Sequence, residues 1–287
     1  MSENELGAFL RTRREAVTPT EVGLPSGPRR RTPGLRRSEV ATLAGISVEY
    51  LARLEQGRDR HPSAQVLGAL ADALRLTLEE RIHLRRLEKE TDGGAGNPCC
   101  PTAVPPADSV RPTVRAILEN LEPLPAVLLN RLADILACTT GYRRIAEPLG
   151  VLDGERPNLA RYVFTDERAR AAYPEWDRLA DNLVGHLRTE SMLDDPHVRG
   201  FTDELTVFAG APFTDRVDGA PTLPRRTGVE RLTHPEAGGL RLSYETLALP
   251  DTDPQRLIVY VPADAATSVA LDRLNGRRPG GLHAVNA

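Results

Sequence analysis

The sequence predicts a multidomain protein in which an all-α domain of five helices precedes an α+β domain. Its 287 residues suggest about two domains. Residues 92–108 are rich in Gly and Pro, which is typical of a linker. Before this segment the apolar residues follow a helical period, and after it helical and strand periods are mixed. We therefore expect domains at 1–91 and 109–287, joined by 92–108.

Composition and charge narrow the class of protein. No apolar run approaches the roughly 18 residues that a membrane span needs, and the N-terminus lacks the apolar region of a secretory signal. Residues 1–90 hold 16 basic and 13 acidic side chains, whereas 91–287 hold 21 and 27. This asymmetry indicates either an anion-binding first domain or a solvated basic face. We expect a cytoplasmic protein.

Five helices are expected in the first domain. Ser2 and Glu5 have the spacing of a capping box at the start of the first helix, and Thr77 and Glu80 repeat it for the fifth, which ends near residue 90. Residues 17–34 are rich in Pro, Gly and Arg and predict an irregular basic loop. The helices between are expected at about 36–44, at 48–56 before Gly57, and from Ser63 to Leu74.

The second domain mixes helices with short strands. Apolar runs at 126–129 and 133–137 flank Asn130 and Arg131, which predicts a hairpin, and residues 211–224 are expected to form a loop. Three more strands are expected at about 229–233, 240–248 and 257–261. Helices are expected around 114–121 and at 140–148, 158–164, 166–172, 175–190, 196–209 and 264–274. Strands interleaved with helices on one sheet make this domain α+β.

Residues 37–56 meet the demands of a helix-turn-helix. Two helices that cross at a tight turn need a small residue at the crossing, which Ala41 supplies, and a residue that adopts the left-handed conformation, which Gly45 supplies. Ser47 can cap the second of the two helices. The apolar residues that point into the angle between the helices are Val40, Ala44, Ile46, Leu51 and Leu54.

A family resemblance extends over most of the chain. The stretch GLRRSEVATLAGISVEYLARLEQGRDRHPSAQVLGALADAL resembles the XRE-type, lambda-repressor-like helix-turn-helix of the MmyB-like regulators of actinobacteria. NLARYVFTDERARAAYPEWDRLADNLVGHLR, from Asn158, and HPEAGGLRLSYETLALPDTDPQRLIVY, from His234, resemble the ligand-binding domain of that family. The chain departs from the family pattern at Cys138-Thr139 and over 211–226. The resemblance implies a lambda-repressor-like DNA-binding domain, a PAS-like second domain, and a small lipophilic ligand such as a fatty acid.

The resemblance also implies which residues contact DNA. The third helix would enter the major groove, where Glu49 can accept from cytosine, Arg53 can donate to guanine and Val48 can touch a thymine methyl group. Tyr50 is open between a groove contact and helix packing. The expected set comprises Arg36, Arg37, Ser47, Val48, Glu49, Tyr50, Arg53, Arg58 and Arg60, of which Arg36, Arg37, Arg58 and Arg60 would contact phosphate. The run from Arg29 to Arg31 is either a further DNA-contacting arm or a solvated loop.

A PAS-like fold encloses a cavity between its sheet and the covering helices. The alternation of the strand at 240–244 places Leu242 and Tyr244 on its inner face. The Tyr244 hydroxyl or Arg161 would meet the carboxylate of a fatty acid. The alternative is that these residues form a packed core that binds no ligand. The expected lining residues are Leu128, Ile135, Arg161, Trp176, Leu179, Leu183, Leu242 and Tyr244.

No catalytic pattern is visible in the sequence. It has no HExxH, GxGxxG, P-loop or GxSxG, and the adjacent Cys99 and Cys100 suit neither a metal site nor an unstrained disulfide. We therefore expect no enzyme, no metal and no cofactor. The expected protein is a sequence-specific, DNA-binding transcription regulator, a homodimer on a pseudo-palindromic operator, with an effector-binding second domain. The alternative is a second domain that serves only dimerisation or protein-partner binding.

Overall fold

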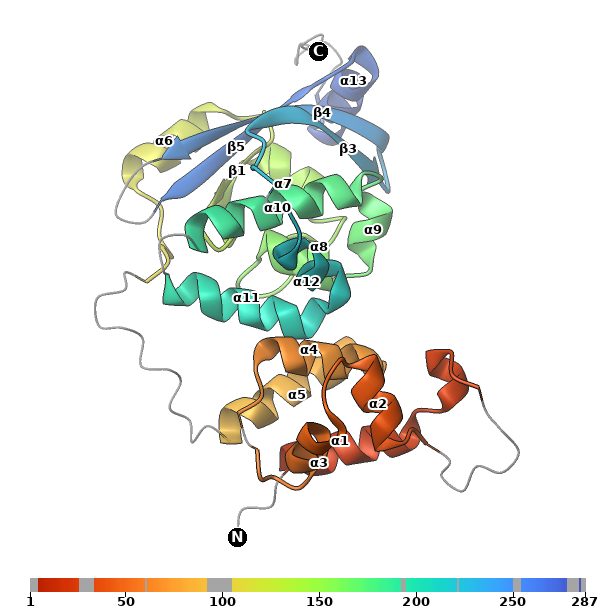
Figure 1. Ribbon diagram of the computed structural model, residues 1–287. Helices are drawn as coiled ribbons and strands as arrows, with labels where there is room; N and C mark the ends of the chain where they lie inside the picture. Colours follow the sequence, from red (N-terminus) through yellow and green to blue (C-terminus); the bar gives the residue numbers. More distant parts are fainter. Residues whose placement is uncertain are drawn as a thin grey trace. The chain divides into compact units, whose positions relative to one another are not determined.

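The computed structural model describes residues 5–25, 34–59, 61–91, 105–191, 195–220, 222–249, 254–277 and 284 (Figure 1). Contacts divide the chain into two compact units. Unit 1 consists of residues 1–101 and 200–218, and unit 2 consists of residues 102–199 and 219–287. The boundaries drawn from the sequence differ from this division at residues 200–218, which the sequence assigns to the second domain.

Unit 1 contains the five predicted helices around one apolar core. They are α1 (Glu5–Ala16), α2 (Arg37–Leu43), α3 (Val48–Glu55), α4 (Ala64–Ala73) and α5 (Leu78–Thr91). A short 3-10 helix, η1 (Pro19–Val22), lies within the segment that the sequence predicts to be a loop. Leucines from every helix but α2 meet in the core, and Val40 and Ala41 join them from α2. The all-α class predicted for this part of the chain is confirmed.

Local chemistry accounts for the helix boundaries. The Ser47 hydroxyl accepts a hydrogen bond from the Tyr50 amide at 3.1 Å and thereby begins α3. Gly45 has φ of +64°, the left-handed conformation that the turn between α2 and α3 requires. The Thr77 amide donates to the Glu80 carboxylate at 2.9 Å, which is the second half of the predicted capping box.

Residues 200–218 add most of α11 (Pro196–Ala209) and all of α12 (Ala211–Asp218) to unit 1. The Asp72 carboxylate accepts hydrogen bonds from the Ala211 amide at 3.0 Å and from Arg81 at 2.6 Å, so it satisfies the start of α12. The prediction of a loop at 211–224 is therefore wrong over 211–218. Pro212 lies in the first turn of α12 and does not prevent the helix, because the N–H groups of a first turn have no acceptor within the helix.

Unit 2 is built on one antiparallel sheet of five strands. The strands are β1 (Ala126–Leu129), β2 (Ile135–Cys138), β3 (Thr227–His234), β4 (Gly238–Leu249) and β5 (Gln255–Pro262), in the order β2-β1-β5-β4-β3. The predicted hairpin at Asn130–Arg131 joins β1 to β2. The helices of this unit are α6 (Pro112–Asn120), α7 (Thr140–Ala146), α8 (Leu159–Thr165), α9 (Arg168–Ala172), α10 (Trp176–Ser191) and α13 (Ala265–Leu274). The α+β class is confirmed.

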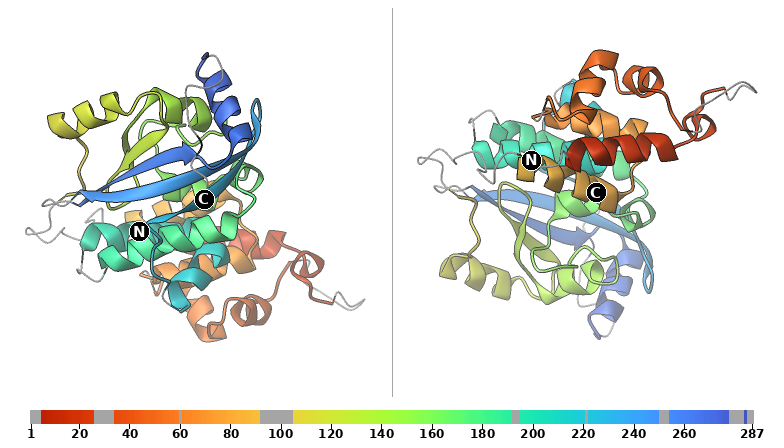
Figure 2. Two further views of the ribbon diagram at one scale, coloured as in Figure 1. Left: turned by 90° about the horizontal axis from the view of Figure 1, so that it is seen from above. Right: turned by 90° about the horizontal axis from the view of Figure 1, so that it is seen from below.

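The register of the strands decides which side chains share a face of the sheet. Tyr244 pairs with Tyr260, and two residues earlier Leu242 lies on the same face, toward α7 and α10. Leu257 is three residues from Tyr260 and therefore lies on the other face, where α6 covers it. Figures 1 and 2 show α10 running along the first of these faces. The cavities described below lie between this helical layer and the sheet.

Candidate functional site

Helix α3 presents one polar face to solvent. Leu51 and Leu54 are buried against the rest of unit 1, whereas Val48 is 40% exposed and Glu49 and Arg53 are exposed. An apolar face that is fixed by the core and an opposite face that is free for contact are the properties of a recognition helix. The exposed face carries a carboxylate, a guanidinium and an apolar group, which are the three kinds of side chain that read base edges.

Arg53 and Tyr50 are neighbours on this face. The Arg53 guanidinium lies 5.4 Å from the centre of the Tyr50 ring and 3.9 Å from the Asp59 carboxylate. Tyr50 is half-buried and packs against the core of unit 1. Helix packing, one of the two roles that the sequence leaves open for Tyr50, is therefore present in the structure. The Arg53 side chain is 50% exposed, so these contacts orient it without burying it.

The phosphate-contacting arginines differ in their surroundings. Arg36 and Arg58 are exposed at the ends of α2 and α3. Arg37 instead donates from Nε to the Glu55 carboxylate at 2.8 Å, although 42% of its side chain remains exposed. Arg60 and the run from Arg29 to Arg31 lie outside the described residues.

Glu55 is a buried charge that the sequence analysis missed. Its side chain is inaccessible to solvent, and Arg14 of α1 donates to it from Nε at 2.6 Å. Burial opposes ionisation of Glu55, but hydrogen bonds from Arg14 and Arg37 outweigh it and lower its pKa. Residue 55 follows Leu51 by four, so the helical period alone would have placed it on the buried face of α3.

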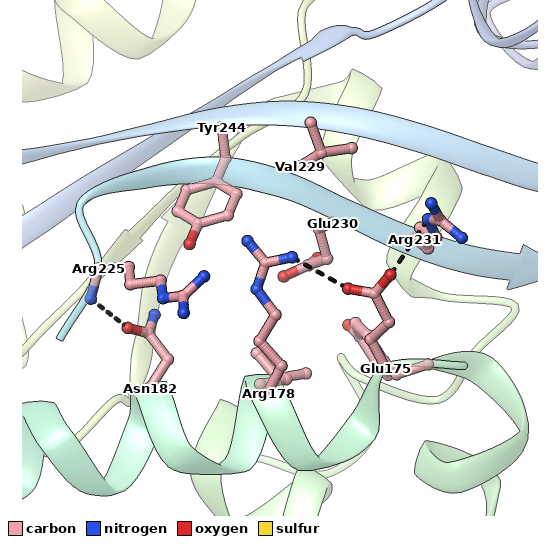
Figure 3. A pocket seen from close by; sticks show the side chains of 10 residues that line it. Glu175, Arg178, Asn182, Arg225, Val229, Glu230, Arg231 and Tyr244 are labelled. Carbon is pink, nitrogen blue, oxygen red and sulfur yellow. Dashed lines mark hydrogen bonds and ion pairs between the residues drawn. The ribbon is translucent and has the colours of Figure 1, made fainter. Parts of the chain in front are cut away.

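The outer of two cavities in unit 2 lies between α10 and the strands β3 and β4 (Figure 3). Its volume is about 30 Å³, which is enough for about two water molecules. Its charged groups are partly paired, because Glu175 accepts from Arg178 and from Arg231, each at 3.1 Å. The Arg225 amide donates to Asn182 at 2.6 Å. The remaining wall includes Leu179, Val229 and Tyr244.

The inner cavity continues toward the middle of the sheet and is smaller. Its volume is about 10 Å³, which is the space of one water molecule. Tyr173 and Glu230 line both cavities, so the two spaces are neighbours. The rest of the inner wall is aromatic or aliphatic and includes Tyr142, Ile145, Leu149, Leu232, Leu242 and Tyr260.

Glu230 is the one acidic residue among those that line the inner cavity. Burial raises the pKa of Glu230 to about 7, although the nearby Arg178 guanidinium acts in the opposite direction. Leu232, two residues later on β3, is buried on the same face, so strand alternation was the signal that could have placed Glu230 inward.

Three of the residues predicted to line a pocket do so. Leu179 and Tyr244 line the outer cavity, and Leu242 lines the inner one. The structure corrects the placement of Leu128, which pairs with Leu257 and packs against α6 on the opposite face of the sheet. The remaining four residues are not part of the lining of either cavity: Ile135, Arg161, Trp176 and Leu183.

Trp176 shows why an apolar residue on α10 need not face the cavity. Its indole N–H donates to the Val163 carbonyl at 2.8 Å, and its ring packs edge-to-face against Phe164. Arg170 covers the ring from a distance of 3.8 Å. Trp176 therefore joins α8, α9 and α10 into one helical layer.

The described residues contain no group of three His, Cys, Asp or Glu side chains placed to hold a metal ion. Cys138 is a free, half-buried thiol whose pKa is raised by burial, and Cys99 and Cys100 lie outside the described residues. Among the helices described, none is both long enough and apolar enough to cross a bilayer.

Models of known families match both parts of the chain. The family model of the MmyB-like transcription regulator ligand binding domain matches residues 110–274, which is more than half of the chain. A helix-turn-helix domain model matches residues 5–84. No curated protein matches the chain. The matched families are a DNA-binding domain and a ligand-binding domain rather than enzymes.

Proposed function

The chain belongs to the MmyB-like transcription regulators, and we propose that it binds a specific operator through α3 and responds to a small lipophilic ligand in unit 2. The observation that carries the DNA-binding half is the exposed face of α3. Val48, Glu49 and Arg53 are accessible there, and Arg36 and Arg58 flank the face with positive charge. Phosphate contacts from such flanking arginines give affinity, and base contacts give sequence preference.

The site for the ligand is the pair of cavities on one face of the sheet, the outer one beside α10 and the inner one beside α7. The inner wall is aromatic or aliphatic apart from Glu230, as is common in small-molecule sites, whereas the outer wall carries five charged residues and Asn182. A ligand with an alkyl chain needs more room than the present volumes of about 30 and 10 Å³, so binding requires these walls to move apart. A fatty acid is the ligand class that the family resemblance suggests. Its carboxylate would meet Arg178 or Arg225 at the outer cavity rather than Arg161.

Regulation in this proposal is a thermodynamic linkage between the two sites. If the ligand changes operator affinity by some factor, the operator changes ligand affinity by the same factor. The test measures thermal stability of the full chain with octanoate, octylammonium and octanol, and then operator affinity with whichever compound binds. Stabilisation together with a change in operator affinity supports a ligand-responsive regulator.

The competing function is a second domain that serves only dimerisation or binding of a protein partner. The small cavity volumes favour it, because a filled core has no need of a ligand. If none of the three compounds raises the melting temperature, the ligand-sensing half of the proposal fails and this alternative replaces it. Operator binding is tested independently of that outcome. A regulator of this kind acts in the cytoplasm, where the DNA lies, and the proposal includes no cofactor.

A further inference from the structure

Glu230 occupies the junction of the two cavities without a bonded partner. Among the residues that the structure describes, none donates a hydrogen bond or forms an ion pair with its carboxylate. The nearest guanidinium, that of Arg178, is instead bonded to Glu175 (Figure 3). Glu230 is half-buried, and removing a carboxylate from water without a partner is costly, so such a group at a cavity is a candidate for a functional site.

Tyrosine rings surround this carboxylate. Tyr142, Tyr173 and Tyr260 line the inner cavity together with Glu230, and Tyr244 lines the outer cavity with it. The pKa values of all four tyrosines are raised, first by burial and also by the charge of Glu230. The centres of the Tyr142 and Tyr260 rings are 6.0 Å apart, and those of Tyr244 and Tyr260 are 6.3 Å apart. A carboxylate within a group of aromatic rings is the arrangement that binds organic cations, because both attract positive charge.

A fatty acid fits this junction poorly in either orientation. With its carboxylate inward, two like charges would face each other at Glu230. With its carboxylate outward at Arg225, its tail would cover Glu230 and remove what solvent the carboxylate has. A primary ammonium group avoids both costs, because it donates up to three hydrogen bonds and carries the opposite charge. It is also close to the size of a water molecule, which is the space that the inner cavity offers.

We propose that the ligand of unit 2 is a lipophilic amine whose protonated nitrogen binds the Glu230 carboxylate within the tyrosine-lined junction. The inference rests on the proposed ligand-sensing function and adds the chemical class of the head group. The alkyl part of the ligand extends along α10 once the walls separate. Arg178 and Arg231 of the outer cavity remain paired with Glu175 and take no part in holding the head group.

The test compares three compounds with the same tail and different head groups, namely octylammonium, octanol and octanoate, by calorimetry on the full chain at pH 8. We expect octylammonium to bind most tightly. Glu230→Gln should weaken octylammonium by roughly ten- to hundredfold, the range for a hydrogen bond to a charged group, and should leave octanol little changed. Glu236→Gln is the matched control, because it removes the same charge from an exposed position just beyond β3.

The outcomes separate this inference from the function on which it rests. Tighter binding of octanoate or octanol than of octylammonium overturns the amine inference and leaves ligand sensing intact. Equal losses of octylammonium affinity in Glu230→Gln and Glu236→Gln also overturn it, because they indicate only attraction to net charge. Binding of none of the three compounds removes both the inference and the ligand-sensing proposal.

A second readout is the effect of pH on octylammonium affinity. The charged groups that line the outer cavity with Glu230 are Glu175, Arg178, Arg225 and Arg231, and the four tyrosines titrate above pH 10. Only Glu230 has a pKa raised to about 7, so affinity should rise about tenfold from pH 6 to pH 8 as it ionises. The Glu230→Gln variant should lack this rise, and an unchanged rise in that variant contradicts the assignment.

Discussion

The buried Glu55 and the half-buried Glu230 have opposite pKa shifts. Glu55 lies among arginines of α1 and α2, and their hydrogen bonds keep it ionised despite burial. Glu230 lies among tyrosine rings, and without a bonded partner its pKa rises to about 7. A paired buried charge fixes structure, because removing one partner leaves the other uncompensated. An unpaired one at a cavity is available to a ligand.

The unpaired state of Glu230 has a measurable effect on stability. Its folded-state pKa lies above its ordinary value, so the stability linked to the neutral form is present below pH 4.5 and lost as pH rises through about 7. Glu230→Gln should therefore be more stable than wild type at pH 8, by up to about 3 kcal/mol at about 1.4 kcal/mol per pKa unit. The difference should shrink toward pH 5.

The single tryptophan allows the unfolding of unit 2 to be measured specifically. Trp176 is the only one in the sequence and lies in unit 2, so its fluorescence during urea unfolding reports that unit. Glu236→Gln, with an exposed side chain, should differ little from wild type at either pH. A Glu230→Gln variant that is less stable than wild type at pH 8 means that the carboxylate has a stabilising partner, which contradicts its role as a free ligand-binding group.

At the scale of elements, we expect base contacts from α3 and phosphate contacts from the arginines that flank it. Arg53→Ala should cost about 1–3 kcal/mol on the specific operator and relax the preference at one base pair. Arg58→Ala should weaken specific and random duplexes alike and lower the salt slope by about one. Salt titrations on both duplexes measure this. Equal losses on the two duplexes for Arg53→Ala remove that residue from the base-reading set.

Arg37 is a poorer test of phosphate contact than Arg58. The sequence predicts it as a phosphate contact at the start of the helix-turn-helix, but the structure shows its Nε bonded to the buried Glu55. Arg37→Ala removes a positive charge from the surface and also one of the groups that keep Glu55 ionised. A loss of DNA affinity in that variant mixes the two effects, whereas Arg58 is exposed and separates them.

The boundaries of the helices can be predicted from the local sequence more closely than the contacts between distant elements can. The caps at Ser47 and Thr77 and the left-handed Gly45 depend on nearby backbone groups, so the sequence predicts them. The helix at 211–218 escaped prediction because its partner, the Asp72 carboxylate, lies 139 residues away in the chain. A local pattern carries no information about an acceptor supplied from that distance.

The cavity lining shows the same limit for strands. Alternation predicts that Leu242 and Tyr244 share a face, and both line a cavity. Alternation within β1 does not reveal which of its two faces lies on the same side of the sheet as Leu242 and Tyr244. The register between β1 and β5 determines this, and it places Leu128 on the side that α6 covers. Glu230 was overlooked because a charged strand residue usually faces solvent, and only the helices packed over β3 enclose it.

At the scale of the whole molecule, one copy of α3 is too short to specify an operator. A helix of eight residues reaches only a few base pairs, so we expect the regulator to read its site with two copies related by symmetry. The helix-turn-helix model matches residues 5–84 and the ligand-binding-domain model matches residues 110–274, so we expect DNA contacts and ligand contacts in different parts of the chain. In the expected dimer, the pairing of two chains sets the spacing at which two α3 helices meet DNA.

This argument predicts two half-sites whose centres lie about one helical turn, or roughly 10 base pairs, apart. Footprinting of the operator should show two protected segments related by a dyad, and the complex should contain two chains per duplex by native mass spectrometry. Inserting about half a turn between the half-sites moves them to opposite faces of the DNA, so affinity should fall toward that of one half-site. Insertion of a full turn is the control for length alone. A single protected half-site with one bound chain contradicts the dimer, and full affinity after the half-turn insertion contradicts a fixed spacing between the two α3 helices.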